Sequence, residues 1–181
     1  LPGALSQHPL HHYDWRAPPP SRGTWIDFPL SRTYARDHAA MSDPIPLLDD
    51  TDPPPYRVAE GSASSPFVIA VDHAGRVIPR GLGTLGLSAS ELDTHIAWDI
   101  GVEGVSRHLA AHLEAFFIAQ TYSRLVIYCN RPLIASSSIA PLSEVTVIPG
   151  NARVTPAEAE ARAQAIFHPN HDRIEAELAR R

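Results

Sequence analysis

The sequence predicts an α/β domain with a mixed sheet, because strand-type and helix-type segments follow one another along residues 65–181. Three short apolar runs, at 67–71, 116–119 and 125–128, have the length and composition of strands. The segments between and after them show helical spacing or begin with helix-capping sequences. The predicted order of elements is therefore β-α-β-β-α-α.

The first 64 residues differ from the rest of the chain. Eleven of the 18 prolines lie within the first 55 residues, and 1–40 shows neither a helical nor a strand period. Two interpretations stay open for 1–40: a Pro-rich disordered tail, or an upstream extension of the gene model before a start at Met41, the only methionine. We expect 41–64 to be irregular and 65–181 to form the domain.

The first predicted strand of the domain is the run at 67–71, which is apolar and rich in β-branched residues. Such a run is typical of a strand buried on both faces. It ends in a loop at 72–80 that is rich in charged and small residues. After this loop, Ser88 and Glu91 have the spacing of a capping box, which predicts a helix running toward His95.

Helical spacing returns before the second strand. An amphipathic helix is predicted over 99–114 from four apolar residues, Val102, Val105, Leu109 and Leu113. The runs at 116–119 and 125–128 then supply two more strands.

The C-terminal segment predicts two helices. Thr155 and Glu158 form a second capping box at the start of the first one. We expect this helix to end near Phe167, because Pro169 lacks the backbone N–H that would continue it. The last helix is predicted from about 171 to 178.

Composition and charge exclude several classes of function. All 15 basic residues are arginine, and with 20 acidic residues the formal net charge is −5. Without lysine or a polybasic patch, we expect no nucleic acid and no anionic membrane as a partner. The single cysteine, Cys129, excludes an internal disulfide and a multi-cysteine zinc site. With no apolar stretch of membrane-spanning length, we expect a cytoplasmic protein.

The loop at 72–80 is the first candidate site, because ligands bind open α/β sheets outside the carboxyl ends of the strands. It carries His73 and Arg76. His95 and Asp99 form a second candidate: they are four residues apart, so in a helix they share one face. An imidazole and a carboxylate suit a borderline cation such as Zn²⁺. Asp99 as a helix cap is the structural alternative.

The third candidate follows the last predicted strands. Tyr122 and Arg124 precede the run at 125–128, and Asn130 and Arg131 follow it. The planar guanidinium of Arg131 can hold a carboxylate with two parallel hydrogen bonds. Tyr122 and Arg124 are expected to brace the loop before they touch a ligand.

Four sequence motifs, three of which contain the candidate residues, resemble those of the N-formylglutamate amidohydrolase family. They are DHAGRVIP at 72–79, HIAWDIG at 95–101, YSRLVIYCNRP at 122–132 and IPGN at 148–151. Order and spacing agree over about 66–181. The resemblance implies a three-layer, mixed-sheet α/β fold related to the zinc carboxypeptidases and aspartoacylases. It also implies hydrolysis of N-formyl-L-glutamate to formate and L-glutamate, a step in histidine breakdown.

The resemblance further implies roles for individual residues. His73 would be a ligand of a divalent metal, with Zn²⁺ as the first candidate, and Asp99 a second ligand. Asn130 and Arg131 resemble the pair with which the related peptidases hold a substrate carboxylate. With Arg76, Arg131 would neutralise the two carboxylates of a small N-acyl amino acid substrate. His73 and Arg131 are therefore expected to face a shared acid-binding cleft.

Three departures from the family pattern bear on activity. Tyr128 stands where the family has aspartate, and Val145 where it has a turn glycine, so Val145 is expected to be strained. The sequence given ends at Arg181, before the family's S-x-H-S-F and E-I-R-x-D segments. The catalytic group is therefore unassigned and expected beyond Arg181. We expect the front half of an enzyme, with weak metal binding and no turnover.

Two other functions stay open. One is a related amidohydrolase acting on another N-acyl amino acid, since a carboxylate-binding arginine says little about the acyl group. The other is a non-catalytic truncated product that binds a small acid or a partner. An exposed sheet edge in such a product would offer a route to self-association.

Overall fold

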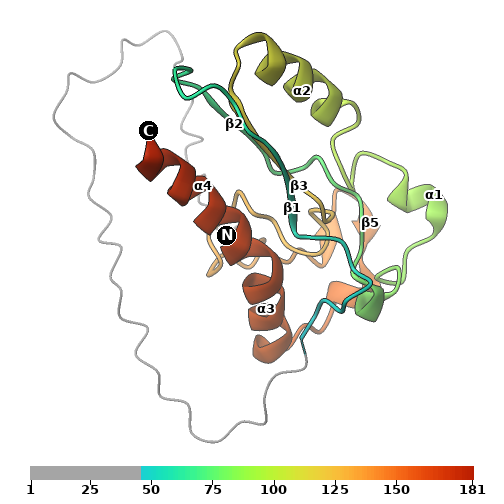
Figure 1. The fold of residues 1–181 in the computed structure, drawn as a ribbon. Helices are drawn as coiled ribbons and strands as arrows, with labels where there is room; N and C mark the ends of the chain where they lie inside the picture. The colour runs from blue at the N-terminus through green and yellow to red at the C-terminus, as the bar shows by residue number, and fades with distance from the viewer. Residues whose placement is uncertain (1–45) are drawn as a thin grey trace, which may run out of the picture. The chain divides into compact units, whose positions relative to one another are not determined.

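The computed structural model describes residues 46–181 (Figure 1). The predictions for 1–40 lie outside the described residues. No helix within the described part of the chain is long and apolar enough to cross a membrane.

A three-stranded sheet forms the centre, and it is mixed, as predicted, although only two of its strands were predicted. Its strands are β1 (Tyr56–Ala59), β2 (Val68–Val71) and β3 (Phe116–Gln120), in the order β1-β3-β2. β3 is antiparallel to β1 and parallel to β2. β1 lies in the stretch 41–64 that was expected to be irregular, so the sequence interpretation missed a strand there.

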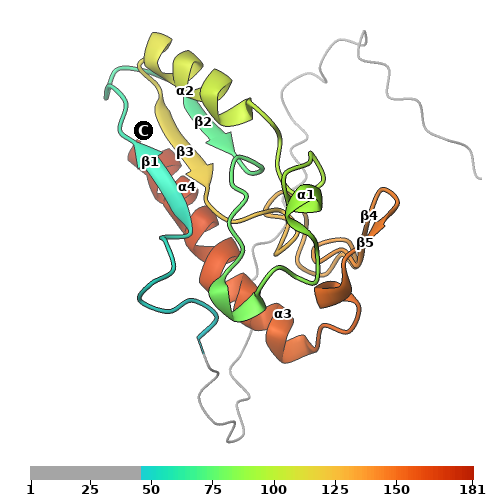
Figure 2. The same ribbon diagram turned by 90° about the vertical axis from the view of Figure 1, so that its right-hand side faces the viewer.

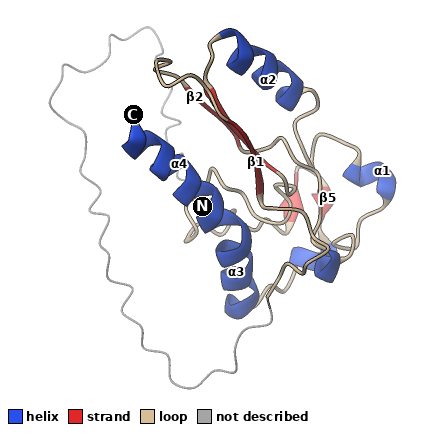
Figure 3. Ribbon diagram, in the orientation of Figure 1, coloured by secondary structure: helices blue, strands red, loops and turns tan. Residues whose placement is uncertain are grey.

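Helices lie on both faces of this sheet. On one face is α2 (Val102–His112), which packs against β2 and β3. On the other is α4 (His168–Arg180), preceded by α3 (Pro156–Arg162), as the two views at right angles show (Figures 1 and 2). The remaining short elements lie beyond the ends of β2 and β3 (Figure 3): α1 (Ala89–Leu92), the antiparallel hairpin β4 (Leu142–Ser143) and β5 (Thr146–Val147), and 3₁₀ turns at Arg80–Leu82 and Pro149–Asn151.

Both predicted capping boxes are confirmed. The Ser88 hydroxyl accepts from the backbone N–H of Glu91, and the Glu91 carboxylate accepts from that of Ser88. Thr155 and Glu158 make the same exchange at the start of α3. Each box satisfies backbone donors that the first helical turn leaves unpaired.

The predicted burial of the first strand is wrong. β2 begins at Val68, and only Val71 of its four residues is buried. Phe67, which was expected to belong to the strand, has 48% of its surface exposed. The reason is that, in the part of the chain that the structure describes, β2 lies at the edge of the sheet and pairs with β3 alone.

The apolar face predicted for α2 is only partly buried. Val102 and Leu113 pack with the buried Ala110 against the sheet. Val105 and Leu109 are 70% and 48% exposed. The helix begins after Gly101, whose φ of +83° ends the preceding turn, so Asp99 does not act as its side-chain cap.

The strand predicted at 125–128 does not form. These residues are a turn followed by irregular chain, although all four are buried. Their backbone carbonyls are satisfied by side chains instead of a strand: Leu125 O accepts from Asn151 at 2.8 Å and Val126 O from Arg162 at 3.0 Å. The apolar side chains of 125–128 explain why the segment is buried, and the hydrogen bonds from Asn151 and Arg162 explain why its backbone need not pair as a strand.

The predicted helix end near Phe167 is wrong as well. A π-helical turn, Ala163–Phe167, connects α3 directly to α4. Pro169 lies in the first turn of α4. The wider turn has i→i+5 hydrogen bonds, so the chain continues past a residue that cannot donate in the ordinary α-helical pattern.

Candidate functional site

The candidate site lies where β2 and β3 end. β2 leads directly into the loop that carries His73, and β3 leads into the segment that carries Arg124. Backbone hydrogen bonds join the two segments: Val77 N–H donates to Thr121 O at 3.4 Å, and Ser123 N–H donates to Val77 O at 2.8 Å. The carboxyl ends of two parallel strands are thus held side by side, as open α/β sheets require for ligand binding.

His73, Asp99 and Arg124 form a charged chain at this end of the sheet. Nδ1 of His73 lies 3.4 Å from Oδ2 of Asp99, while Oδ1 of Asp99 accepts a hydrogen bond from Nη2 of Arg124. The same Nη2 donates to the backbone carbonyl of His95 at 2.7 Å. Asp99 N–H donates to His73 O at 2.9 Å, so the backbone fixes the pair as well.

Beside this chain is a cavity of about 300 Å³. Three segments far apart in the sequence line it: 95–99, the chain after β3, and the β4–β5 hairpin. Its polar and aromatic lining includes His95, Asp99, Arg124, Tyr128, Arg131 and Glu144. Four predicted residues, from two separate motifs, therefore meet at one cavity. His73 does not line the cavity itself, but it contacts two residues that do, Asp99 and Tyr128.

The Tyr128 ring lies between two predicted site residues. The guanidinium carbon of Arg131 is 3.5 Å from the ring centroid, and the His73 ring approaches it edge-on at 5.5 Å between centroids. His73 and Arg131 are thus near one another, and the phenol side chain fills the space that separates them. Tyr128 is 5% exposed, so it forms a fixed wall.

The β4–β5 hairpin brings Glu144 to the cavity. Nε2 of His95 and Oε1 of Glu144 are 2.9 Å apart, although the residues are 49 positions apart in sequence. The expected strain at Val145 is wrong: the left-handed φ, +52°, is at Glu144, and Val145 is a 92% exposed neighbour. The turn therefore places its unfavourable backbone conformation at the residue that contacts the cavity.

Arg131 carries a positive charge that no carboxylate neutralises within residues 46–181. Its Nη1 donates to the backbone carbonyl of Ser137 at 2.7 Å, which orients the guanidinium and leaves its other N–H groups available. The other arginine of the cavity is paired, because Arg124 binds Asp99. The Glu144 carboxylate is hydrogen-bonded to His95.

Three other predicted residues lie outside the cavity lining. Arg76 is paired with Asp93 at 2.7 Å and lies over the Trp98 ring. Asn130 is exposed to solvent. Tyr122 is fully buried and donates to the carbonyl of Pro53 at 2.6 Å. Burial, followed by the nearby charge of Asp52, raises the pKa of Tyr122 to about 12.

A divalent metal fits part of this arrangement. Nε2 of His73 is buried and has no hydrogen-bond partner in the described part of the chain, so it is free to bind an ion. Its other ring nitrogen faces Asp99. Among residues 46–181, however, no three His, Cys, Asp or Glu side chains gather closely enough to hold a metal. The described residues thus offer a partial metal site, since catalytic zinc usually has three protein ligands.

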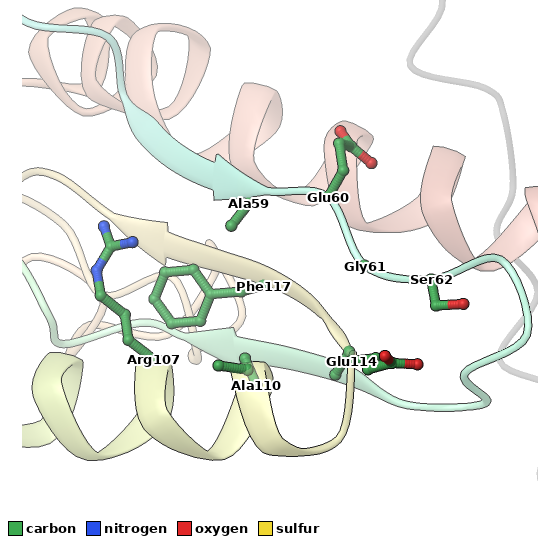
Figure 4. A pocket seen from close by; sticks show the side chains of 10 residues that line it. Ala59, Glu60, Gly61, Ser62, Arg107, Ala110, Glu114 and Phe117 are labelled. Atoms are coloured by element: carbon green, nitrogen blue, oxygen red, sulfur yellow. The ribbon is translucent and has the colours of Figure 1, made fainter.

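A second cavity, of about 490 Å³, lies at the opposite end of the sheet (Figure 4). Alanines and Phe117 line much of it, and Arg107 lies over the Phe117 ring at 4.7 Å. Arg107 is already paired with Glu103. This cavity is at the start of β3, away from the strand ends where α/β sheets bind ligands.

The sequence interpretation missed Glu144 and Tyr128 as cavity residues. Tyr128 differed from a family pattern, yet no local signal showed that its ring would contact His73 and Arg131. Glu144 could have been found by predicting a two-residue turn between 142–143 and 146–147, which would place it at a hairpin tip.

Comparison with known proteins agrees with the fold and the motifs. The model of the N-formylglutamate amidohydrolase family matches residues 65–181. Among solved structures, the gene product Atu2144 from Agrobacterium tumefaciens is similar, with a TM-score of 0.69 and 38% identity over 74% of this chain. The match covers 53% of that protein, so this chain spans about half of its length. No curated protein matches. With the family model covering more than half of its residues, the chain belongs to the N-formylglutamate amidohydrolase family.

Proposed function

We propose that this domain binds the carboxylate of an N-acyl amino acid and takes part in hydrolysis of its amide bond. Membership of the N-formylglutamate amidohydrolase family supports the reaction class, with formate and L-glutamate as the products that the family name indicates. A fold of the zinc-carboxypeptidase kind is part of the same proposal.

The observation that carries the proposal is the state of Arg131. Its guanidinium lines a cavity of about 300 Å³, is oriented by Ser137 O and by the Tyr128 ring, and has no carboxylate partner in the described residues. A guanidinium fixed in this way is ready to accept a carboxylate with two parallel hydrogen bonds. Because its orientation is fixed before binding, little conformational entropy is lost when the ligand arrives.

The neighbouring residues supply orientation. Arg124 holds the Asp99 carboxylate, and Asp99 faces Nδ1 of His73. We propose that His73 would hold a divalent metal through Nε2, and that Asp99 fixes the tautomer and direction of the imidazole. When bound, the metal would polarise the amide carbonyl of the substrate.

The binding role is tested by calorimetric titration of the 181-residue chain with N-formyl-L-glutamine and N-formyl-L-glutamate. The variant Arg131→Ala should lower the affinity for both ligands at least about tenfold, because a carboxylate in the cavity loses its partner. Arg153→Ala is the matched control, since Arg153 is an exposed arginine that does not line the cavity. Unchanged affinity in Arg131→Ala would contradict the proposal.

Metal binding has a separate measurement. Equilibrium dialysis against Zn²⁺, together with the visible spectrum of bound Co²⁺, reports on the His73 site without requiring turnover. His73→Ala should abolish bound metal, whereas His112→Ala, which removes an exposed histidine of α2, should not. Equal metal content in the wild type and His73→Ala would exclude His73 as a ligand.

A non-catalytic role is the second candidate, and the partial metal site favours it. A domain that binds an N-acyl amino acid but holds no complete metal site would act as a binding module. Formate release from an N-formyl amino acid with added Zn²⁺ distinguishes the two: release supports the hydrolase, and binding without release supports the module.

A further inference from the structure

The aromatic ring at the cavity supports one further step, which rests on the proposed function. We infer that Tyr128 is a positioning residue for the carboxylate of the ligand. Its ring, and not its hydroxyl group, holds the Arg131 guanidinium in the orientation that binds the anion. Tyr128 thus acts on the ligand through Arg131.

The first step is the geometry of the contact between Tyr128 and Arg131. The guanidinium carbon lies 3.5 Å from the centroid of the ring, which is van der Waals contact between carbon atoms. A carbon in the plane of the ring would collide with ring atoms at this distance, so the guanidinium lies over the face. It is also nearly flat, since a steep tilt would push one of its nitrogens into the ring. The N–H groups therefore point along the edges, where a carboxylate accepts two parallel hydrogen bonds.

The second step is that the ring itself is fixed. Tyr128 is buried, and its backbone N–H donates to Ser138 O at 2.8 Å. The neighbouring carbonyl, that of Ser137, accepts from Nη1 of Arg131 at 2.7 Å, so one loop holds both residues. The His73 ring lies nearly at right angles to the phenol, with 85° between the two planes. A ring that is held by its own backbone and contacted by the imidazole can in turn hold the guanidinium.

The third step compares Arg131 with other arginines that lie over aromatic rings. Among residues 46–181 there are three, with guanidinium carbons 4.4–5.5 Å from the ring centroids, and each also binds a carboxylate: Arg76, Arg107 and Arg173. The contact between Tyr128 and Arg131 is shorter than these, and both of its residues line the cavity of about 300 Å³. A carboxylate orients an arginine and neutralises it, whereas an aromatic face orients it and leaves its charge for a ligand.

Loss of the ring should weaken ligand binding although the charge of Arg131 stays. In Tyr128→Leu the guanidinium gains further rotamers that it has to give up when the ligand binds, so the affinity should fall about fivefold. Tyr128→Phe keeps the ring and removes the hydroxyl group. Its affinity should stay within about twofold of the wild type, because the contact with the guanidinium is made by the ring.

Calorimetric titration with N-formyl-L-glutamate and N-formyl-L-glutamine measures these affinities. Phe117→Leu is the matched control, because it also removes a buried ring that lies under an arginine, Arg107, at the other cavity (Figure 4). The control should lose stability, as Tyr128→Leu does, and keep the affinity of the wild type. Circular dichroism establishes that each variant is folded at the temperature of the titration.

A second measurement reports the contact without any ligand. Protons that lie over the face of an aromatic ring resonate upfield of their usual position in an NMR spectrum. The Nε–H proton of Arg131 should therefore be shifted upfield in the wild type and in Tyr128→Phe, and should return to its usual position in Tyr128→Leu. Arg131→Lys identifies this resonance by removing it.

The outcomes separate the two proposals. If the wild type binds neither ligand, the proposed function fails, and the inference fails with it. If the wild type binds and Tyr128→Leu binds equally well, Tyr128 does not position Arg131, and the proposed carboxylate binding stands. Equal losses in Tyr128→Phe and Tyr128→Leu would assign the effect to the hydroxyl group and overturn the inference. A loss as large in Phe117→Leu, or an unshifted Arg131 resonance in the wild type, would overturn it as well.

Discussion

Two segments that contact the same cavity are stabilised in opposite ways. The segment 125–129, which ends just after Tyr128, is buried throughout and has no regular secondary structure. Its carbonyls accept hydrogen bonds from side chains outside the segment. Three of these come from far along the chain: Asn151 donates to Leu125 O, Arg162 to Val126 O, and the His171 ring contacts Cys129 O. The fourth, Gln120, lies at the end of β3 and donates to Ile127 O. A buried irregular segment is stable only when such partners are present.

The hairpin at 142–147 is the opposite case. It has regular pairing over two residues on each side, yet Leu142, Val145 and Val147 are 53%, 92% and 61% exposed. Within residues 46–181, its link to the 95–99 segment is one exposed polar contact, between His95 and Glu144. Exposed pairs of this kind contribute about 0–1 kcal/mol.

The difference separates the scaffold of the site from its rim. Segment 125–129 holds Arg124 and Tyr128 in place through many buried contacts, so substitutions there should cost stability. The hairpin presents Glu144 with few contacts, so substitutions there should change binding and leave the fold intact. Specificity can therefore vary at the rim without loss of the scaffold.

The largest expected effect concerns Cys129, at the end of the buried segment. Burial, with a smaller contribution from the charge of Asp72, raises the pKa of this thiol to about 12 from its usual 9.0. The thiol of the unfolded chain therefore loses its proton at a lower pH than the buried thiol, and this ionisation favours the unfolded state. The free energy of unfolding is unaffected below pH 9 and falls as pH rises from 9 toward 12. Three pKa units correspond to about 4 kcal/mol at most.

Urea unfolding between pH 8 and pH 12, with a reductant present, measures this slope. The chain has no lysine, so apart from the N-terminal amine only the thiol and five tyrosines titrate in that range. Cys129→Ala should flatten the profile. If the free energy of unfolding falls as steeply with pH in Cys129→Ala as in the wild type, water reaches the Cys129 thiol in the folded chain.

The next largest effect is expected from Asn151→Ala. The Asn151 side chain donates to Leu125 O and Ala140 O and accepts from Arg162. Its loss leaves two buried carbonyls without a partner and removes one hydrogen bond from Arg162, which keeps its bond to Val126 O, so the unfolding free energy should fall by about 3 kcal/mol. Ser143→Ala in the hairpin is the control and should cost less than about 0.5 kcal/mol. Equal costs would remove the distinction between scaffold and rim.

Local signals in the sequence were enough for part of this fold. The capping boxes at Ser88 and Thr155 were predicted correctly because all their partners lie within four residues. The strand predicted at 125–128 failed because an apolar run specifies burial and leaves the hydrogen-bond partners open. The helix end near Pro169 failed because a π turn accommodates a residue that an α-helix excludes.

The same reasoning explains which site residues were found. His73 lies beside the cavity because it directly follows β2, whereas Arg131 lines the cavity although the strand predicted before it does not form. Glu144 was missed: a predicted two-residue turn would have placed it at a hairpin tip, but its place at the cavity also depends on the hairpin folding back onto His95, 49 residues earlier. Tyr128 was noticed as unusual, but its contacts on both sides depend on tertiary packing.

A smaller effect is expected at the point where the N-terminal segment meets the scaffold. Tyr122 donates to Pro53 O from a fully buried position, so Tyr122→Phe leaves one carbonyl without its partner and should cost about 1 kcal/mol. Chemical denaturation of both proteins at pH 7 measures the difference. Tyr56→Phe, which changes a partly exposed tyrosine of β1, is the control. A change no larger than the control would mean that Pro53 is satisfied by water.

The smallest expected effect tests the turn of the hairpin itself. At an ordinary position glycine is about 0.5–1 kcal/mol less stable than alanine, because it loses more backbone entropy on folding. At Glu144 the order should reverse, since a φ of +52° disfavours any residue with a Cβ atom by about 1 kcal/mol. Glu144→Ala and Glu144→Gly both remove the pair with His95, so their difference reports the backbone alone. Thermal unfolding should therefore rank Glu144→Gly above Glu144→Ala. The ordinary order would mean that the turn between β4 and β5 is not of type II′, the type in which glycine is preferred at the position of Glu144.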